Sequence, residues 1–289
     1  DLVHCNHFFL MPIARRLSRG NAPILLDTHD LQARQFALIN ETKPWLSPRA
    51  TFESMLAQEL EAMRGADLLL HLNAQEAEDF HALLPEKAHA LLYPAVPEAP
   101  TGPGGPDIIL VASNNTANVE SVIWFLREIA PKTQGVVVKI VGNVDAVVRS
   151  KAPEQYAAYK GWFTGRVEDP SAVYASARIA LLPTISGTGL SIKSVEALSS
   201  GLPLIATRQA MRGMDEEALR LRGVVIADSA LEFAQALSRV AASAPLDESA
   251  RRASPARRYY ESRFSLAAYK ASLRVLTGAL LSAVGENRR

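Results

Sequence analysis

Residues 164–207 read TGRVEDPSAVYASARIALLPTISGTGLSIKSVEALSSGLPLIAT, and this stretch decides the fold class. It predicts a turn, a short helix, a buried strand, a glycine-containing loop, a second helix and another buried strand. The loop at 186–189 leads directly into the second helix, which carries Lys193 and Glu196. Backbone N–H groups at a helix N-terminus lack intrahelical partners, and the helix dipole adds about half a positive charge there. The stretch therefore predicts an anion-binding site, which the charge of Lys193 strengthens.

The helix places two charged side chains on one face. Lys193 and Glu196 are three residues apart and so share a face of the first two turns. A buried stripe is supplied by Ile192, Val195 and Leu198. A lysine can bind phosphate, and a carboxylate can accept two charge-assisted hydrogen bonds from a sugar diol. Two simpler interpretations stay open: glycines that only allow a tight turn, and a surface ion pair.

Composition sets the broad class of the chain. With 289 residues, 48% of them hydrophobic and 21% charged, the chain fits a globular protein of about two domains. A net charge of +1 does not indicate a nucleic-acid partner. The single cysteine, Cys5, permits no internal disulfide, and we expect a cytoplasmic protein. No run of about 18 apolar residues predicts a membrane span, and a weak peripheral contact with the inner face of a membrane is left open.

The first part of the chain alternates strands and helices, which favours a mostly parallel sheet. One helix is predicted to begin with Ser47 as N-cap and Pro48 at the first position. Another is predicted after Asn73, with Glu76 completing a capping box. We assign residues 1–93 to a partial N-terminal domain, because a strand pattern starts at once and suggests that earlier parts of a longer protein are missing. Strands are predicted at 2–5, 24–26, 68–72 and 90–93.

Residues 94–106 contain five prolines and three glycines and predict an extended, solvated inter-domain linker. A second alternating set at 107–247 predicts another Rossmann-like domain, and 248–289 predicts helices, broken near 264–265, that pack back across the domains. We therefore expect an α/β protein in which two such domains face a cleft, with the loop at 186–189 at the carboxyl ends of the strands. Predicted strands lie at 108–112, 136–141, 162–164, 179–182, 204–206 and 224–226; predicted helices lie at 118–130 and 191–200 and after an Asp228 cap.

The chain resembles a known family at the quoted stretch. Gly187-Thr188-Gly189-Leu190, Lys193, Glu196-Ala197-Leu198, Gly201 and the run 203–207 resemble the donor-site signature of retaining glycosyltransferases of family 4, which have the GT-B fold. The likeness is strongest over 108–213 and looser elsewhere. Further similar segments are 164–167 with Pro183, Asn118 with 124–126, 140–142, 26–30 and 66–67.

The resemblance implies transfer of a sugar, with retention, from a nucleoside-diphosphate donor to a glycan, lipid-linked or small-molecule acceptor, as in polysaccharide biosynthesis. It implies catalytic roles for His29, Lys193 and Glu196: His29 orients the donor sugar, Lys193 binds phosphate and Glu196 fixes the ribose. It implies no metal or other cofactor. The implied donor-binding residues are Ser113, Asn114, Arg166, Val167, Ser186, Gly187, Thr188, Gly189, Leu190, Lys193 and Glu196.

The chain departs from the family at two places. Ser186 or Thr188 stands where the family has a loop glutamate, and residues 113–115 read Ser-Asn-Asn where an Arg and a Lys are usual. A second hypothesis is therefore a non-catalytic GT-B domain that binds a sugar nucleotide or serves as a scaffold in a larger protein. A Rossmann oxidoreductase is disfavoured, because Gly187-x-Gly189 lacks the third glycine of the dinucleotide fingerprint.

Two further clusters have simpler interpretations. His4 and Cys5 should point to opposite faces of a strand, so the cluster of His4, Cys5 and His7 does not predict a metal site. The sequence contains no Asp-x-Asp pair to hold a metal on a diphosphate. The basic run Arg251-Arg252 and Arg257-Arg258 is interpreted as a solvated helix face, with a membrane or nucleic-acid contact as the alternative.

Overall fold

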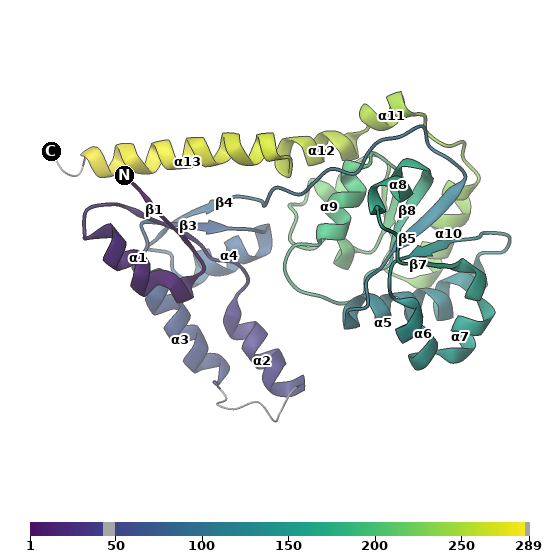
Figure 1. The fold of residues 1–289 in the computed structure, drawn as a ribbon, viewed down its shortest axis with the longest axis horizontal. Helices are drawn as coiled ribbons and strands as arrows, with labels where there is room; N and C mark the ends of the chain where they lie inside the picture. Colours follow the sequence, from purple (N-terminus) through teal and green to yellow (C-terminus); the bar gives the residue numbers. More distant parts are fainter. Residues whose placement is uncertain (43–49, 287–289) are drawn as a thin grey trace. The chain divides into compact units, whose positions relative to one another are not determined.

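The computed structural model describes residues 1–42 and 50–286. The chain divides into two compact units (Figure 1). The first unit is Asp1–Pro94 with Ala267–Arg289, and the second is Ala95–Leu266. Each unit is built on its own parallel β-sheet with helices packed on it, which confirms the predicted α/β class.

The first unit contains a four-stranded sheet in the order β1-β2-β3-β4. Successive residues of β2 serve opposite faces: Leu26 packs into a cluster with Met11 and Phe80 of the neighbouring helices, and Leu25 packs with Tyr269 of α13. Both faces of the sheet are therefore covered, which explains its continuous apolar strands. The elements are β1 (Val3–Asn6), η1 (Phe8–Leu10), α1 (Met11–Ser18), β2 (Ile24–Asp27), α2 (Gln32–Thr42), α3 (Phe52–Met63), β3 (Leu68–His71), α4 (Ala74–Leu83), β4 (Ala88–Leu91) and nearly all of α13 (Leu266–Glu286).

Two predicted helix starts in this unit differ in detail. The N-cap of α3 is Thr51, whose hydroxyl accepts a hydrogen bond from the Ser54 N–H at 3.1 Å. The start predicted at residues 47 and 48 lies outside the described residues, and Ala50 and Thr51 precede the helix. Asn73 does cap α4, yet the Glu76 carboxylate accepts from the Asn73 side-chain amide at 2.6 Å instead of from its backbone N–H. Half of the expected capping box is therefore formed.

The second unit contains six parallel strands in the order β10-β9-β8-β5-β6-β7. From β5 the chain first adds β6 and β7 on one side of that strand. It then crosses to the other side of β5 and adds β8, β9 and β10, so the strand order reverses between β5 and β8. The strands are β5 (Asp107–Val111), β6 (Lys139–Val141), β7 (Phe163–Gly165), β8 (Ala177–Leu182), β9 (Leu204–Ala206) and β10 (Val224–Ile226).

The hydrophobic core at this second sheet contains Phe125, Ile140, Ile179, Ile205 and Phe233. Helices cover the sheet. They are α5 (Thr116–Trp124), η2 (Phe125–Ile129, a π-helical turn), η3 (Ala130–Lys132), α6 (Asp145–Lys151), α7 (Pro153–Ala158), η4 (Lys160–Trp162), α8 (Pro170–Ala175), α9 (Ile192–Ser199), η5 (Arg208–Met211), η6 (Ala218–Arg220), α10 (Ala230–Ala241), α11 (Glu248–Arg252) and α12 (Pro255–Arg263).

The cap of α10 was predicted one residue early. Ser229 is the N-cap and forms a reciprocal capping box with Glu232. The Asp228 carboxylate instead accepts a hydrogen bond from the Arg208 N–H at 2.6 Å. The predicted break near 264–265 is confirmed, since α12 ends at Arg263 and α13 begins at Leu266.

The expectation of a solvated segment at 94–106 is wrong for part of the segment. The segment contains no helix or strand before Asp107, as its composition predicts, but Val96, Ala99 and Thr101 are buried in the second unit. The Val96 N–H donates to the Phe264 carbonyl at 2.9 Å, and the Tyr260 hydroxyl donates to the Val96 carbonyl at 2.6 Å. These hydrogen bonds thus fasten the segment at Val96 to α12 and to the residue directly after it.

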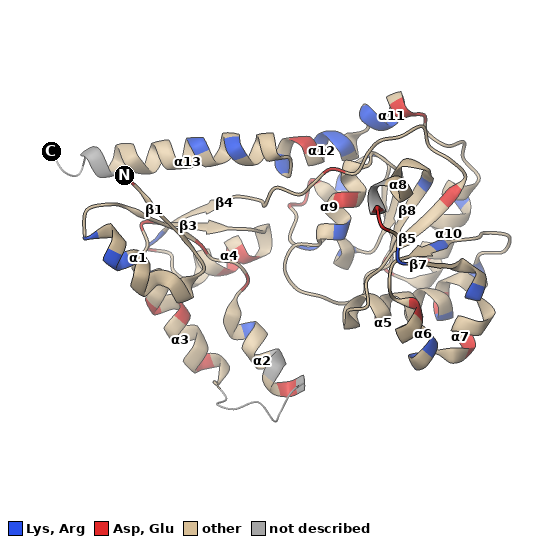
Figure 2. Ribbon diagram, viewed as in Figure 1, with Lys and Arg blue, Asp and Glu red and all other residues tan. Residues whose placement is uncertain are grey.

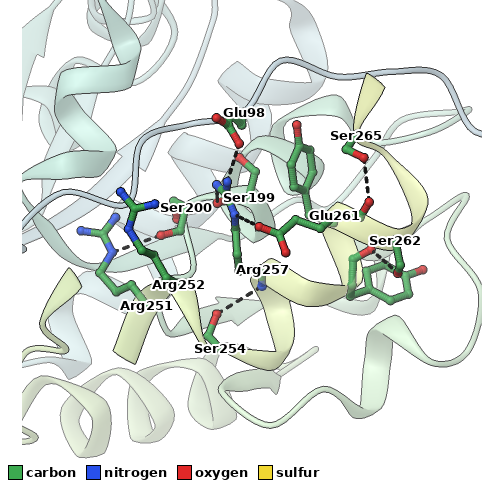
Figure 3. Close-up of polar contacts among 12 residues, drawn as sticks. Glu98, Ser199, Ser200, Arg251, Arg252, Ser254, Arg257, Glu261, Ser262 and Ser265 are labelled. Atoms are coloured by element: carbon green, nitrogen blue, oxygen red, sulfur yellow. Dashed lines mark hydrogen bonds and ion pairs between the residues drawn. The ribbon is translucent and has the colours of Figure 1, made fainter. Parts of the chain in front are cut away.

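The interpretation of the basic run as a solvated face is also wrong for half of its members. Figure 2 shows Lys and Arg spread over helices of both units, with several on α11 and α12. Arg251 is fully buried and Arg257 is 8% exposed, whereas Arg252 and Arg258 are exposed. The buried guanidiniums donate to backbone carbonyls of neighbouring segments (Figure 3), an arrangement that a sequence pattern does not reveal.

Among the described residues, none of the helices is both long and apolar enough to cross a bilayer.

Gly142 at the end of β6 offers a test of the packing next to β5. Its φ is +126°, and a Cβ there would lie 1.9 Å from the Ala112 carbonyl oxygen. Gly142→Ala should lower the free energy of unfolding by about 2–4 kcal/mol, from backbone strain and overpacking. Gly161→Ala is the matched control, because a Cβ there meets nothing within 4 Å. Urea unfolding measures both; an equal stability for the two variants would contradict the packing described.

Candidate functional site

The reversal between β5 and β8 creates a crevice at the carboxyl ends of these strands, the place where open α/β sheets bind ligands. A cavity of about 210 Å³ lies there. Its walls come from the ends of β5 and β8 and from the first turns of α5 and α9. Its polar lining comprises Asn115, Asn118, Ser121, Thr184, Ser186, Ser191, Lys193 and Arg212. Two helix N-termini therefore border one cavity.

The N-terminus of α9 has unsatisfied donors. Within the described chain, the backbone N–H groups of Gly187, Gly189, Ile192 and Lys193 donate no hydrogen bond. Ser191 occupies the N-cap position, but its side chain does not cap the helix. Orphan N–H groups beside a cavity and a positive dipole end form a binding site for an anion.

The Ser191 hydroxyl is occupied elsewhere, which explains the missing cap. It lies 2.8 Å from the Ser194 hydroxyl, and that hydroxyl donates to the Ala210 carbonyl. Some helices of this unit are capped by a side chain; Asn115 of α5, for example, accepts from the Asn118 N–H at 2.9 Å. The helices α6 and α7 lack a side-chain cap, as α9 does. What sets α9 apart is that its N-cap residue is a serine whose hydroxyl lies against Ser194 instead of capping the helix.

The glycine loop is fixed by its carbonyl groups. The Gln209 side-chain amide donates to the Gly187 carbonyl at 2.7 Å, and Arg212 Nε donates to the Thr188 carbonyl at 3.2 Å. Gly187 has a φ of +131°, and a Cβ there would lie 2.9 Å from the Arg212 guanidinium. Glycine is therefore required at this position, while the N–H groups of Gly187 and Gly189 stay available.

Lys193 links α9 to the loop after β5. Its Nζ donates to the Ser113 hydroxyl at 3.3 Å, and that hydroxyl also accepts from the Asn118 side chain at 2.7 Å. Burial lowers the pKa of Lys193 to about 8, and the nearby Glu196 carboxylate opposes this shift. Burial raises the pKa of Glu196, opposed by Lys193. A partly buried cation in a cavity with few polar partners is suited to an anionic ligand.

The structure brings only part of the predicted donor set to the cavity. Ser186 and Lys193 line it, and the glycine loop and Leu190 lead into α9 at its edge. The Asn114 N–H donates to the Asn143 side chain at 3.1 Å, and Glu196 is half-buried one turn beyond Lys193. Arg166 is exposed after β7, and neither it nor Val167 lines the cavity.

Asn115, Ser121 and Thr184 line the cavity but were not in the predicted donor set. Only the positions of Asn115 and Thr184 after predicted strands could have indicated that these residues line the site. Polar residues that follow neighbouring parallel strands at their carboxyl ends converge on one edge of the sheet. Arg212 follows η5 and reaches the loop only through the fold.

His29 lies in the first unit, directly after β2. Its φ is +55°, an uncommon conformation for a residue other than glycine. Its Nε2 is hydrogen-bonded to the Asn6 side chain, and its ring stacks on His7 with centroids 5.2 Å apart. The following N–H groups are held by a buried carboxylate: Glu59 accepts from the Gln32 N–H at 3.0 Å. His29 is thus held at the carboxyl edge of this sheet.

The possible metal ligands behave as strand alternation predicts. His4 is exposed and pairs with Asp27 at 3.1 Å, whereas Cys5 is buried. In the part of the chain that the structure describes, no group of three or more His, Cys, Asp or Glu side chains could hold a metal ion.

Part of the chain is similar to a known protein family. Residues 105–243 match the family described as Glycosyl transferases group 1. This segment spans both sides of the crevice and most of the second unit. Among curated proteins, no sequence match to the chain was found.

Solved structures extend the likeness over both units. HepE from Anabaena, solved in complex with UDP, has 13% identity and a TM-score of 0.66, with 96% of this chain and 79% of HepE covered. Sucrose-phosphate synthase from Thermosynechococcus elongatus has 18% identity and a TM-score of 0.62, with 98% and 74% covered. WaaG, a glycosyltransferase of lipopolysaccharide biosynthesis, has 15% identity and a TM-score of 0.60, with 92% and 81% covered. The fold is of the GT-B type.

The buried Lys193 should cost stability in the unliganded protein. Because its pKa is about 8 in the folded chain and 10.5 when exposed, the unfolded state binds more protons between these values. Lys193 therefore makes stability rise as pH increases from about 8 to 10.5. Lys193→Met should increase the free energy of unfolding at pH 7 by about 1–2 kcal/mol, an advantage that shrinks across this pH window. Unfolding in urea at several pH values measures it, and a constant difference between variant and wild type would contradict the burial argument.

Proposed function

We propose that the protein transfers a sugar, with retention, from a nucleoside-diphosphate donor to a glycan, lipid-linked or small-molecule acceptor. The observation that carries the proposal is the set of unsatisfied N–H groups at the N-terminus of α9, beside Lys193 and a cavity at the strand-order reversal. The group 1 glycosyl transferase match over the same segment supports it. HepE, of the same fold, was solved with UDP and with UDP-glucose.

The proposed chemistry needs stabilisation of the diphosphate leaving group. The N–H groups of 187–190 and Lys193 supply positive potential for the charge that develops on the phosphates. Glu196 accepts hydrogen bonds from the ribose hydroxyls. In this proposal His29 orients the donor sugar, because it lies directly after β2. No metal or other cofactor is included, and the proposed setting is the cytoplasm, with a peripheral membrane contact as an option for a lipid-linked acceptor.

A second candidate function is binding of a sugar nucleotide without transfer. Ser186 lines the cavity. It lies in the loop in which the family that this sequence resembles has a glutamate that contacts the donor sugar. A hydroxyl there supplies less electrostatic stabilisation than a carboxylate. Incubation of the protein with UDP-, GDP- and ADP-sugars and an acceptor panel separates the two: release of nucleoside diphosphate with a new glycoside supports transfer, and saturable binding without turnover supports the second candidate.

Lys193→Ala and Glu196→Ala test the site directly. Thermal-shift screening with UDP, GDP and ADP selects the nucleotide, and calorimetry then measures its affinity. Each substitution should weaken binding at least tenfold, because a charge-assisted hydrogen bond contributes about 1.5–3 kcal/mol. Lys160→Ala and Glu154→Ala are matched controls, since both side chains are exposed in the same unit. Unchanged affinity in both site variants would end the assignment.

The affinity for the nucleoside diphosphate should also depend on pH. Below pH 8 Lys193 is protonated and attracts phosphate; as pH rises through about 8 it loses its charge, so affinity should fall. Lys193→Arg keeps its charge across this range and should flatten the profile between pH 7 and about 10. Calorimetry at steps of half a pH unit measures both proteins. A wild-type profile as flat as that of the arginine variant would exclude Lys193 as the phosphate ligand.

A further inference from the structure

Two buried arginines meet the carboxyl end of α9, the end opposite the proposed phosphate site. Arg251 Nε donates to the Ser200 carbonyl at 3.1 Å, and Arg257 Nη1 donates to the Ser199 carbonyl at 2.6 Å. Figure 3 shows both side chains pointing from α11 and α12 toward these residues. The last carbonyls of a helix lack intrahelical partners and carry the negative end of its dipole, so guanidiniums are favourable donors there.

Arg251 joins two helix ends. Its Nη2 donates to the Tyr174 carbonyl at 2.8 Å and its Nη1 to the Ala175 carbonyl at 3.0 Å, at the end of α8. Further donations at 3.4 Å reach the carbonyls of Pro100 and Gly102. Its hydrogen-bond acceptors are therefore all backbone carbonyls, and the side chain is 0% exposed. The fork of a guanidinium can satisfy several acceptors at once, which an ammonium cannot do with the same geometry.

Arg257 fastens the segment that precedes β5 to the same helix end. It pairs with Glu98 and with Glu261 at 2.8 Å, and its Nη1 also donates to the Ala99 carbonyl at 3.3 Å. The Ala99 N–H in turn donates to the Ser199 hydroxyl at 2.7 Å. The last turn of α9 is thus held from α12 and from the segment at 98–102.

The backbone directly after α9 also packs closely against the backbone of Arg251. Gly201, directly after α9, has a φ of +70°, and a Cβ there would lie 2.2 Å from the Arg251 carbonyl oxygen. The Ser199 hydroxyl donates to the Glu196 carbonyl at 2.7 Å, inside the helix that carries the proposed ribose ligand. An eight-residue helix is about 12 Å long and stiff, so fixing one end also fixes the other.

We propose that Arg251 and Arg257 are positioning residues for the nucleoside-diphosphate site: they hold the carboxyl end of α9 so that its amino end presents its N–H groups and Lys193 to the diphosphate. This inference rests on the proposed function. Neither arginine touches the cavity, and both act through α9. The two buried arginines orient α9, whose other end must bind an anion without a side-chain cap.

Arg257→Gln tests the proposal, with Arg258→Gln as matched control, because Arg258 is the exposed neighbour and its side chain donates only to the Ala253 carbonyl among the described contacts. Calorimetry with UDP, GDP and ADP is carried out at a temperature well below the melting point of each variant. Arg257→Gln should weaken binding of the preferred nucleotide about tenfold, Arg257→Lys should recover about half of that loss on a logarithmic scale, and Arg258→Gln should stay within twofold of wild type.

A second measurement separates positioning from simple stabilisation. In protein labelled with ¹⁵N-glycine, the amide signals of Gly187 and Gly189 report the amino end of α9 without nucleotide. They should shift in Arg257→Gln and not in Arg258→Gln. Arg257→Gln with a lowered melting temperature but unmoved glycine signals and affinity within twofold would overturn the proposal. If wild-type protein binds none of the three nucleotides, the proposed function fails, while the glycine signals still decide whether Arg257 sets this end of the helix.

Discussion

The strand-order reversal between β5 and β8 is the constraint on which the site depends. Two chain connections leave neighbouring strands in opposite directions, so a crevice must open at their carboxyl ends. The helices that follow, α5 and α9, both begin at this crevice, and their first turns line the same cavity. Lys193 is 80 residues away from Ser113 in the sequence, yet it meets Ser113 and Asn118 in one hydrogen-bonded group because the reversal places them there.

Within that crevice, two features of α9 lower the stability of the fold. Its amino end keeps donors unsatisfied, and burial disfavours the charge of Lys193. Stability is supplied at the other end, where Arg251 and Arg257 satisfy the carbonyls of two helices and of the segment before β5. The side chains of Val195 and Leu198 are fully buried. An open amino end and a tightly held carboxyl end fit a helix whose task is to bind an anion.

Much of the fold could be predicted from sequence because the apolar runs are strongly periodic. The strands at 68–72, 179–182, 204–206 and 224–226 were placed within two residues of their positions, and the break at 264–265 was found. Caps were less predictable: Ser229 took the place of Asp228, since both residue types can accept a hydrogen bond from the first turn. Arg251 and Arg257 were misplaced on the surface, because a charged residue is buried only when distant carbonyls converge on it.

The sequence by itself determined the alternation of strands and helices, the glycine loop before α9, and the spacing of Lys193 and Glu196 on one helix face. These are local properties, set by side-chain periodicity and by the backbone freedom of glycine. Only the tertiary structure decided which polar residues share the cavity, why Ser191 leaves the helix uncapped, and where the buried arginines donate. Such contacts join residues far apart in the sequence, as in the pairing of Arg257 with Glu98 across 159 positions, and depend on packing that no local pattern encodes.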